Sequence, residues 1–436
     1  MKHTYNLIAG MTSFFKMINK KALFISGVNT ILMIFCYFML YKFEIITVFP
    51  NDQNIVSWDA VWYNQIRESG YRYLPFQVSN MAFFPLFSLF WKVTQFSSIH
   101  VSIFNAIIFM ISFSLLIGKG KFKTVYLLVL VSLPCFIFFY LPYTEALFFL
   151  FGTFIIMGYR NNSMSLLIIG IFGCCLTRAV STVFIPILIL TELFCWDNSK
   201  DRFSDVLKRV FIYCAVALLC ILIVVLIQGV QTDKWFYYIE AVKYYDRHLI
   251  FPSIPFSTYS PEMVLGIDGI AWVLGIIAMS FCLKWGMGYM RNFFYENGSG
   301  QIVDRSVCFS ALFLSSVVFL DTFFTNNIGN STNIWSINRH LLCTPFAIYF
   351  INWFRADYNI KKYDIYSTLV ILILGLFITG IFKYPHHIIF YFLFSTSLIV
   401  SKFINKASLM LFPMYIFNLV LFAIFYYQFL SVKWIG

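Results

Sequence analysis

The residue types best suited to chemistry gather in a short aromatic stretch, residues 57–87, where Asp59 lies between Trp58 and Trp62. A carboxylate in such a place can take a proton from a hydroxyl, because partial desolvation between aromatic rings raises its basicity. The same pattern fits an interfacial helix whose carboxylate faces water and whose rings lie at the level of lipid headgroups. Asp59 is therefore the candidate general base, with an interfacial anchor as the alternative.

Positive charge that could hold a phosphate occurs at two places further along the chain. Arg178 lies in an otherwise apolar run, where an unpaired guanidinium is costly, and Arg339 and His340 precede another apolar run. A guanidinium fork matches the oxygens of a phosphate. We expect Arg178, Arg339 and His340 to bind a donor phosphate, with a snorkelling arginine and an interfacial anchor as the alternatives.

Other polar and aromatic side chains could contact the rest of a substrate. Glu145 is expected to orient Arg178 or a sugar, or only to favour the start of a helix. The aromatic residues could stack on sugar faces or hold the membrane interface. Asp321 is a further carboxylate candidate. The expected substrate-binding residues are Trp58, Trp62, Tyr63, Tyr71, Glu145, Asp246, Arg247 and His248.

Composition places the chain in a membrane. It has 436 residues, of which 60% are hydrophobic and 11% charged, and its mean hydropathy is +0.80. These values exclude a soluble globular protein. The net charge of +12 is spread between apolar runs, so membrane topology explains it better than a nucleic-acid partner does. The 10 cysteines show no metal-ligand spacing, so neither a metal, a bound cofactor nor a disulfide framework is expected.

Apolar segments predict an all-α, polytopic helical protein with about 13 transmembrane helices in a single domain, residues 1–436. The first span is expected to stay as an anchor. Residues 83–95 are short and contain a proline, which favours an interfacial or re-entrant helix. The expected spans are 22–47, 100–118, 124–140, 144–158, 164–176, 179–194, 207–229, 263–286, 305–324, 338–354, 365–383, 387–401 and 408–428. The two around Thr177 and Arg178 could instead form one long helix.

The distribution of positive charge predicts the orientation in the membrane. With the N-terminus inside and residues 83–95 not crossing, most of the 31 lysines and arginines fall on the cytoplasmic side. Residues 50–99 then form the first extracytoplasmic loop, which contains Asp59. Residues 230–262 form a second long extracytoplasmic loop, and residues 325–340 lie on the same side.

Four short motifs resemble the PIG-V family of integral membrane mannosyltransferases, which belong to the GT-C superfamily and include the enzyme that adds the second mannose of the GPI anchor. The motifs are WDAVWY with Gly70-Tyr71 and AFFPLF, then Pro142–Leu147, Leu176–Arg178 and Asn338–Leu342. Family members often have Pro-Arg-Tyr where this chain has Asn338-Arg339-His340, and Ser-Glu-Ser character where it has Thr-Glu-Ala. The resemblance implies a GT-C-like first extracytoplasmic loop that carries Asp59, the catalytic carboxylate, on interfacial helices. It also implies mannose as the sugar.

These observations favour an inverting, metal-independent glycosyltransferase. Outside the membrane no nucleotide sugar is supplied, and the chain has no nucleotide-binding motif, so a polyprenyl-phosphate sugar is the expected donor. A lipid-linked or envelope glycan, or a glycolipid, is the expected acceptor, and membrane lipids are the other partners. Composition favours a bacterial cell membrane, with the endoplasmic reticulum as the location if the source is eukaryotic. The alternative function is a lipid-linked glycan flippase or transporter, which should show charges near the middle of the membrane and paired broken helices.

Overall fold

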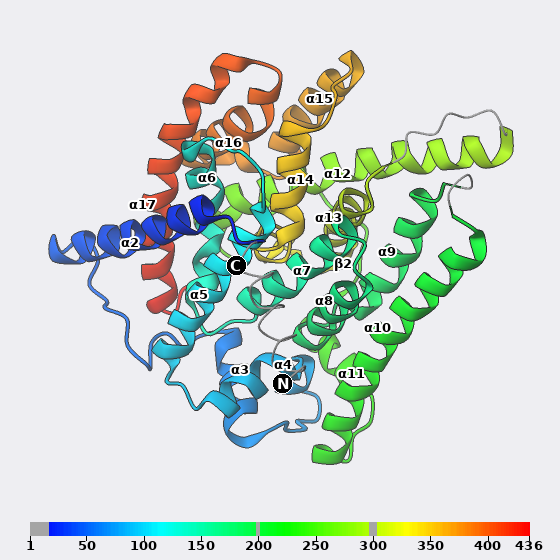
Figure 1. Cartoon of the computed structure of the whole chain (residues 1–436). Helices are drawn as coiled ribbons and strands as arrows, with labels where there is room; N and C mark the ends of the chain where they lie inside the picture. The colour runs from blue at the N-terminus through cyan, green and yellow to red at the C-terminus, as the bar shows by residue number, and fades with distance from the viewer. Residues whose placement is uncertain (1–16, 198–200, 296–302) are drawn as a thin grey trace, which may run out of the picture.

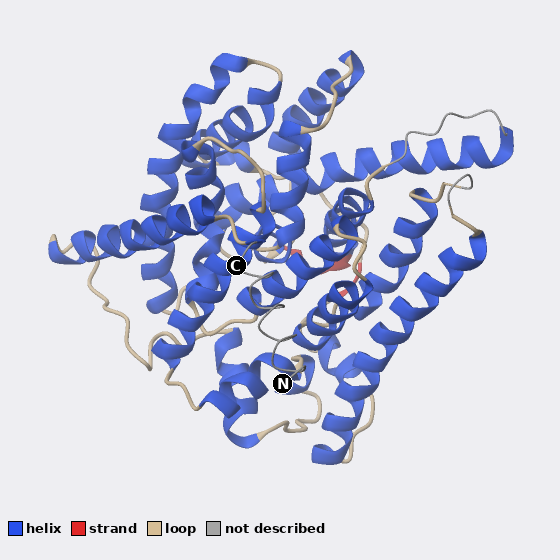
Figure 2. Cartoon of the chain, in the orientation of Figure 1, coloured by secondary structure: helices blue, strands red, loops and turns tan. Residues whose placement is uncertain are grey.

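The computed structural model describes residues 17–197, 201–295 and 303–436. Within these ranges the chain is almost entirely helical, and its strands are only two residues long (Figure 2). The first half contains α2 (Lys20–Lys42), α3 (Asp59–Ser69), η1 (Asn80–Ala82), α4 (Pro85–Thr94), α5 (Ser98–Ile117), α6 (Thr124–Val131), η2 (Pro134–Tyr140), α7 (Glu145–Arg160), α8 (Met164–Thr177), α9 (Ser181–Phe194) and α10 (Phe203–Thr232).

The second half continues the helical arrangement to the end of the chain (Figure 1). It contains α11 (Tyr237–Lys243), β1 (His248–Leu249), α12 (Pro261–Tyr295), α13 (Arg305–Phe323), β2 (Phe324–Thr325), β3 (Asn327–Ile328), β4 (Ser331–Thr332), η3 (Asn338–Leu342), α14 (Pro345–Ala356), α15 (Lys362–Ile378), η4 (Ile381–Lys383), α16 (Pro385–Phe394), η5 (Ser395–Ile399), η6 (Val400–Lys402), η7 (Asn405–Met410) and α17 (Leu411–Leu430).

The prediction of about 13 spans is wrong for the described residues. Among the residues that the structure describes, six helices are long and apolar enough to cross a membrane. The count rises to seven if the bent pair η2 and α7, which meet at 102°, forms one span. Such a set indicates a multi-pass integral membrane protein. The six helices are Lys20–Lys42, Ser98–Ile117, Phe203–Thr232, Pro261–Arg291, Arg305–Phe323 and Lys406–Leu430.

Helix length explains the lower count. α8 and α9 have 14 residues each, α14 has 12 and α16 has 10. Fourteen residues rise only about 21 Å, less than the roughly 30 Å of a hydrocarbon core. Pro345 begins a new helix inside the predicted span 338–354, because a proline is favoured at a first turn and disfavoured within a helix.

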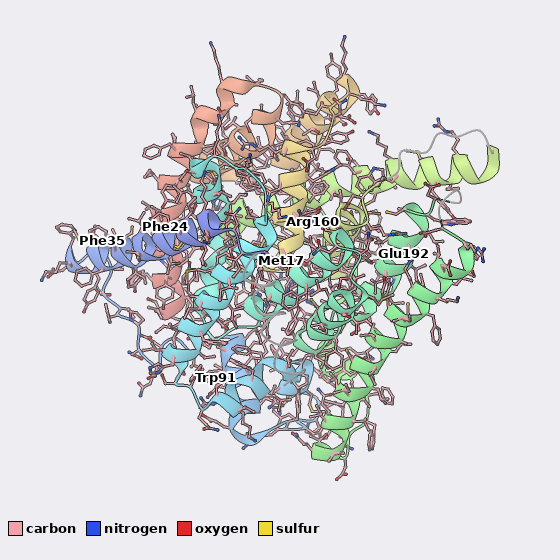
Figure 3. All side chains as sticks on the ribbon, in the orientation of Figure 1. Met17, Phe24, Phe35, Trp91, Arg160 and Glu192 are labelled. Atoms are coloured by element: carbon pink, nitrogen blue, oxygen red, sulfur yellow. The ribbon has the colours of Figure 1, made fainter. Side chains whose placement is uncertain are left out.

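The long helices differ in how much of their surface other helices cover. Only 28% of the apolar window of α2 is buried, and the same share of α10, whereas 83% of Pro261–Arg291 is buried. Phe24 and Phe35 lie on α2 where it extends from the bundle (Figure 3), and they are 72% and 56% exposed. These bare apolar faces are suited to contact with lipid, while α12 belongs to the core.

Both long loops fold into short helices at one end of the bundle (Figure 1). Residues 50–99 contain α3, η1 and α4, and residues 230–262 contain α11 and β1. β1 pairs with β2 in antiparallel register, which joins the second loop to the segment after α13. A bridge between Ser257 and Asn333 adds a second link. The two loops and residues 324–342 therefore meet in one region.

Candidate functional site

Asp59 is the first residue of α3, where a carboxylate is favoured by the helix dipole. Trp58 before it has a left-handed φ of 56°, which turns the chain sharply into the helix. The side chain of Asp59 is 18% exposed, and its Oδ2 lies 2.7 Å from Nη2 of Arg339. The predicted carboxylate and the second predicted arginine, 280 residues apart in sequence, are thus in direct contact.

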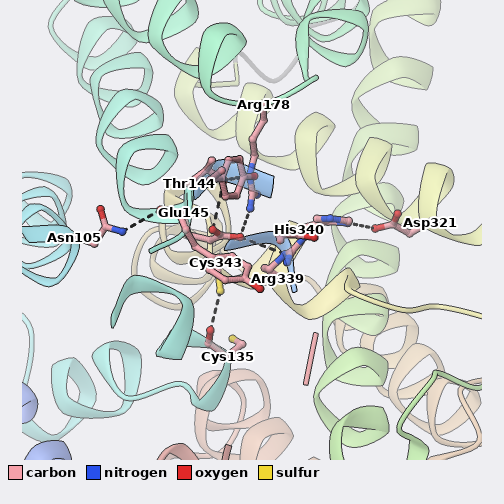
Figure 4. A network of polar contacts seen from close by, with 12 residues as sticks. Asn105, Cys135, Thr144, Glu145, Arg178, Asp321, Arg339, His340 and Cys343 are labelled. Atoms are coloured by element: carbon pink, nitrogen blue, oxygen red, sulfur yellow. Dashed lines mark hydrogen bonds and ion pairs between the residues drawn. The ribbon is translucent and has the colours of Figure 1, made fainter. Parts of the chain in front are cut away.

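Glu145 joins both predicted arginines. It begins α7 and is completely buried, and its Oε1 contacts Nη2 of Arg178 and lies 3.2 Å from Nε of Arg339 (Figure 4). Arg178 occupies the break between α8 and α9 and also donates from Nε to the hydroxyl of Thr144 at 3.0 Å. A fully buried carboxylate is tolerated when cations pair with it.

The formal charges of Asp59, Glu145, Arg178 and Arg339 sum to zero, but not every N–H group of the Arg339 guanidinium has a hydrogen-bond partner among the described residues. Its Nη1 is buried and makes no hydrogen bond within the described residues. The guanidinium carbon lies 5.4 Å from the ring centre of Phe138 and 5.5 Å from that of Tyr143, which supply cation–π contacts instead. Arg339 is therefore held from several sides at the centre of the site.

A second polar group surrounds Asp321. Nη1 of Arg247 donates to Oδ1 of Asp321 at 2.8 Å, and Nδ1 of His340 lies 3.0 Å from Oδ2. These residues come from the loop after α11, from α13 and from η3. Burial lowers the pKa of His340, and Arg339 and Arg247 lower it further, while Asp321 acts in the opposite direction. The imidazole is therefore neutral at pH 7.

The two groups line one cavity of about 330 Å³. Its polar wall includes Asp59, Arg178, Arg247, Asp321, Arg339 and His340. Its apolar wall comes from α9, α13 and the segment before α9, and includes Val180, Val183, Phe313, Val317 and Leu320. The arrangement can hold an anionic or polyhydroxylated group at one side and hydrocarbon at the other.

The aromatic residues predicted to touch substrate divide between the cavity and the surrounding core. Tyr63 lines the cavity. Burial raises its pKa, so its hydroxyl remains protonated. Tyr71 is buried and donates its hydroxyl to the carbonyl of Phe83, so it acts in packing. Trp62 stacks on Phe83 and lines a different hollow.

Trp58 lies next to the cavity without lining it, and it contacts Trp434 edge to face with ring centres 5.0 Å apart. In the second loop only Arg247 among the predicted trio lines the cavity. Asp246 accepts a hydrogen bond from Asn326, and His248 is exposed beside it. The trio therefore does not act as one group.

The structure adds residues that the sequence did not single out. Tyr245, Trp335 and Trp434 line the cavity. Asp268 on α12 accepts hydrogen bonds from the backbone and side-chain nitrogens of Asn338, at 3.0 and 2.7 Å, and so anchors η3. A lone charge in an apolar run was the available signal for Asp268. Nothing in the local sequence marks Trp434, which reaches the site because the segment after α17 turns back into the protein.

Within the described residues no group of three or more His, Cys, Asp or Glu side chains is placed to hold a metal ion. Comparisons with protein-family models, with curated proteins and with solved structures found no match.

Proposed function

We propose that this chain transfers a sugar, mannose by its resemblance to the PIG-V family, from a polyprenyl-phosphate donor to a hydroxyl of a lipid-linked or envelope glycan. The observation that carries the proposal is the single cavity with a charged wall and an apolar wall. A phosphate-linked sugar on a lipid has the same division, with an anionic and hydroxylated head and a hydrocarbon chain. The cavity volume of about 330 Å³ is within the usual range for small-molecule sites.

The arginines are suited to the departing phosphate. Three arginines and two aspartates line the cavity, which gives a formal charge of 3 − 2 = +1 at its wall, with Glu145 buried behind them. Arg178 uses Nε and Nη2 for protein contacts, and Arg247 uses Nη1, so each keeps other N–H groups. Preorganised donors of this kind stabilise charge that develops on a leaving oxygen.

The proposed reaction is a single displacement with inversion. The acceptor oxygen attacks the anomeric carbon, and the bond from that carbon to the phosphate oxygen breaks with its electron pair going to the phosphate. The acceptor proton goes to Asp59. Because Arg339 holds the Asp59 carboxylate at 2.7 Å, the base is fixed in position before substrate binds.

Purified protein in lipid nanodiscs would be incubated with polyprenyl-phosphate [3H]mannose and a membrane lipid extract as acceptor. We expect label to appear in a new product with wild-type protein, with no label from GDP-mannose and no effect of EDTA. Label that remains in the donor, together with passage of a fluorescent polyprenyl-phosphate lipid across a proteoliposome bilayer, would replace the proposal with the flippase alternative.

A further inference from the structure

The contacts of Asp321 decide how His340 can act. Its Oδ1 accepts from Arg247 and its Oδ2 faces Nδ1 of His340 at 3.0 Å. Asp321 is ionised beside the arginine, and a carboxylate can only accept. The proton of a neutral imidazole must therefore lie on Nδ1. Nε2 then carries a lone pair and is an acceptor.

Nε2 of His340 is accessible to a hydrogen-bond donor bound in the cavity. His340 lines the cavity, and its side chain is 27% exposed. Within the described residues, Nε2 makes no hydrogen bond and is not among the enclosed polar atoms without a partner. Arg247, the other partner of Asp321, is also held in place, because its guanidinium carbon lies 5.0 Å from the ring centre of Trp335. His340 thus presents one oriented acceptor atom to whatever fills the cavity.

This geometry changes the partner expected for His340. The sequence predicted that His340 binds a phosphate. Ionised phosphate oxygens can only accept hydrogen bonds, as Nε2 does here, so the two could not form a hydrogen bond with each other. A hydroxyl can donate to Nε2. In the proposed reaction the attacking hydroxyl gives its proton to Asp59, so the partner of His340 is a hydroxyl that does not react. The transferred sugar carries several such hydroxyls and must occupy the cavity during the reaction.

We propose that Nε2 of His340 accepts a hydrogen bond from one hydroxyl of the transferred sugar, and that Asp321 and Arg247 hold the imidazole in the tautomer that allows it. This makes His340 a residue that determines sugar specificity. The inference rests on the proposed function, because it takes the bound group to be a sugar.

A set of donors, each with one sugar hydroxyl replaced by hydrogen or by fluorine, would test the inference. Sites built to hydrogen-bond a hydroxyl reject analogues that lack it by large factors, so we expect wild-type kcat/KM to fall about 100-fold or more at one position. Fluorine cannot donate, so the fluoro and deoxy donors at that position should lose equally. In His340→Phe, kcat/KM for these donors and for the full sugar should agree within about 3-fold. His340→Gln, whose Oε1 can accept a hydrogen bond, should keep part of the difference in kcat/KM.

His248→Phe is the matched control, since His248 is exposed and outside the cavity. A loss in His340→Phe that is equal for every donor, including all deoxy sugars, would overturn the inference and make His340 a base or a packing residue. Acid provides a second readout. Protonation of Nε2 removes its lone pair, so the preference of wild-type protein for the full sugar over the deoxy donor should decline as the pH falls through the pKa of His340. Burial lowers this pKa, Arg339 and Arg247 lower it further, and Asp321 acts in the opposite direction. His340→Phe should show no such decline.

Binding separates this inference from the proposed function. Octyl mannoside and its deoxy analogues can be titrated by tryptophan fluorescence, because Trp335 and Trp434 line the cavity. If wild-type protein binds octyl mannoside with selectivity at one hydroxyl that His340→Phe removes, the inference stands even where no transfer occurs and the proposed reaction fails. Binding with the same affinity for every analogue would overturn it.

Discussion

Arg339 is the residue through which the two predicted parts of the site are connected. It pairs with Asp59 through Nη2 at 2.7 Å and with Glu145 through Nε at 3.2 Å. A lysine has one compact charge on a flexible stem and cannot make both contacts in the same fixed plane. The geometry of the Asp59 carboxylate, the proposed base, therefore depends on the shape of the guanidinium as well as on its charge.

Arg339→Lys should lower donor kcat/KM by about 10-fold or more, because lysine can keep only one of the two ion-pair contacts. Arg339→Met should be more severe because it also leaves Asp59 without a counter-charge. The matched control is Arg67→Lys, since Arg67 pairs with Glu68 at the other end of α3. Equal donor kcat/KM for Arg339→Lys and wild type would show that the shape of the guanidinium is not needed and that its positive charge is sufficient.

Substitution of Glu145 tests how much the buried ion pairs with Arg178 and Arg339 contribute to the stability of the protein. Glu145→Gln keeps the shape of the side chain and removes the fully buried charge shared by Arg178 and Arg339. Breaking a buried ion pair leaves a cation uncompensated, so the variant should lose about 3 kcal/mol of unfolding free energy in detergent. Glu68→Gln, at a side chain that is 57% exposed, should change stability by less than about 1 kcal/mol. Similar unfolding curves for both variants would show that the buried pair contributes little.

At the scale of helices, the site depends on close packing of α7 against α8. Glu145 begins α7 and Arg178 follows α8, so the separation of these helices sets whether the two side chains meet. Gly170 permits this approach. A Cβ at Gly170 would lie 2.7 Å from the carbonyl oxygen of Phe151 and 2.8 Å from the backbone nitrogen of Ile155. Backbone atoms cannot move aside as a flexible side chain can.

Gly170→Ala should therefore push α8 away from α7, with a cost of about 1–3 kcal/mol that is typical of overpacking. It should also lower transfer several-fold, because Arg178 moves with the end of α8. Gly288→Ala in α12 is the control, as a Cβ there meets nothing within 4 Å. Thermal unfolding and transfer rates of both variants would be compared. A Gly170→Ala protein as stable and active as wild type would mean that the helix spacing does not position the site.

Sequence patterns located the helices better than they decided which ones cross a membrane. The six long apolar helices each overlap a predicted span, and the segment at 83–95 is the short helix α4 that its proline indicated. Around Thr177 and Arg178 the structure has two helices with a break, one of the two possibilities the sequence left open. Hydropathy marks apolar segments without regard to whether the helix is long enough to cross a bilayer, so short apolar helices such as α8 were predicted to be spans.

At the scale of the whole molecule, the cavity brings together residues from Asp59 to Trp434. Single residues such as Asp59 and Arg339 could be chosen from the sequence because charge and aromatic neighbours are conspicuous in an apolar chain. Their partners could not, because contacts between distant segments depend on tertiary packing. Asp268 beneath Asn338, and Trp434 beside Trp58, are examples.

The loops that build the cavity should face one side of the membrane. Single cysteines at the exposed positions Gln53, Asp246 and Asn330 are expected to react with an impermeant maleimide from the extracytoplasmic side, and one at Lys119 only after permeabilisation, since α5 separates Lys119 from the first loop. Eight of the ten native cysteines are buried and the other two half-buried, so wild-type protein is the background control. Labelling of position 53 only after permeabilisation would reverse the orientation and remove the argument for a lipid-linked donor.

The central claim is that Asp59 accepts the proton in a glycosyl transfer, and the transfer rate of Asp59→Asn tests it most directly. Asparagine keeps the size of the side chain and one acceptor oxygen but cannot take the proton, so the rate from polyprenyl-phosphate mannose should fall by about 100-fold or more. Asp52→Asn is the matched control in the same loop, because Asp52 is exposed and lies outside the cavity. The account predicts a near wild-type rate and thermal stability for Asp52→Asn. It predicts a folded but less stable Asp59→Asn protein, because the guanidinium of Arg339 loses the carboxylate that lies 2.7 Å from its Nη2. A folded Asp59→Asn protein that keeps a third or more of the wild-type rate would contradict the claim and make Glu145 the leading carboxylate.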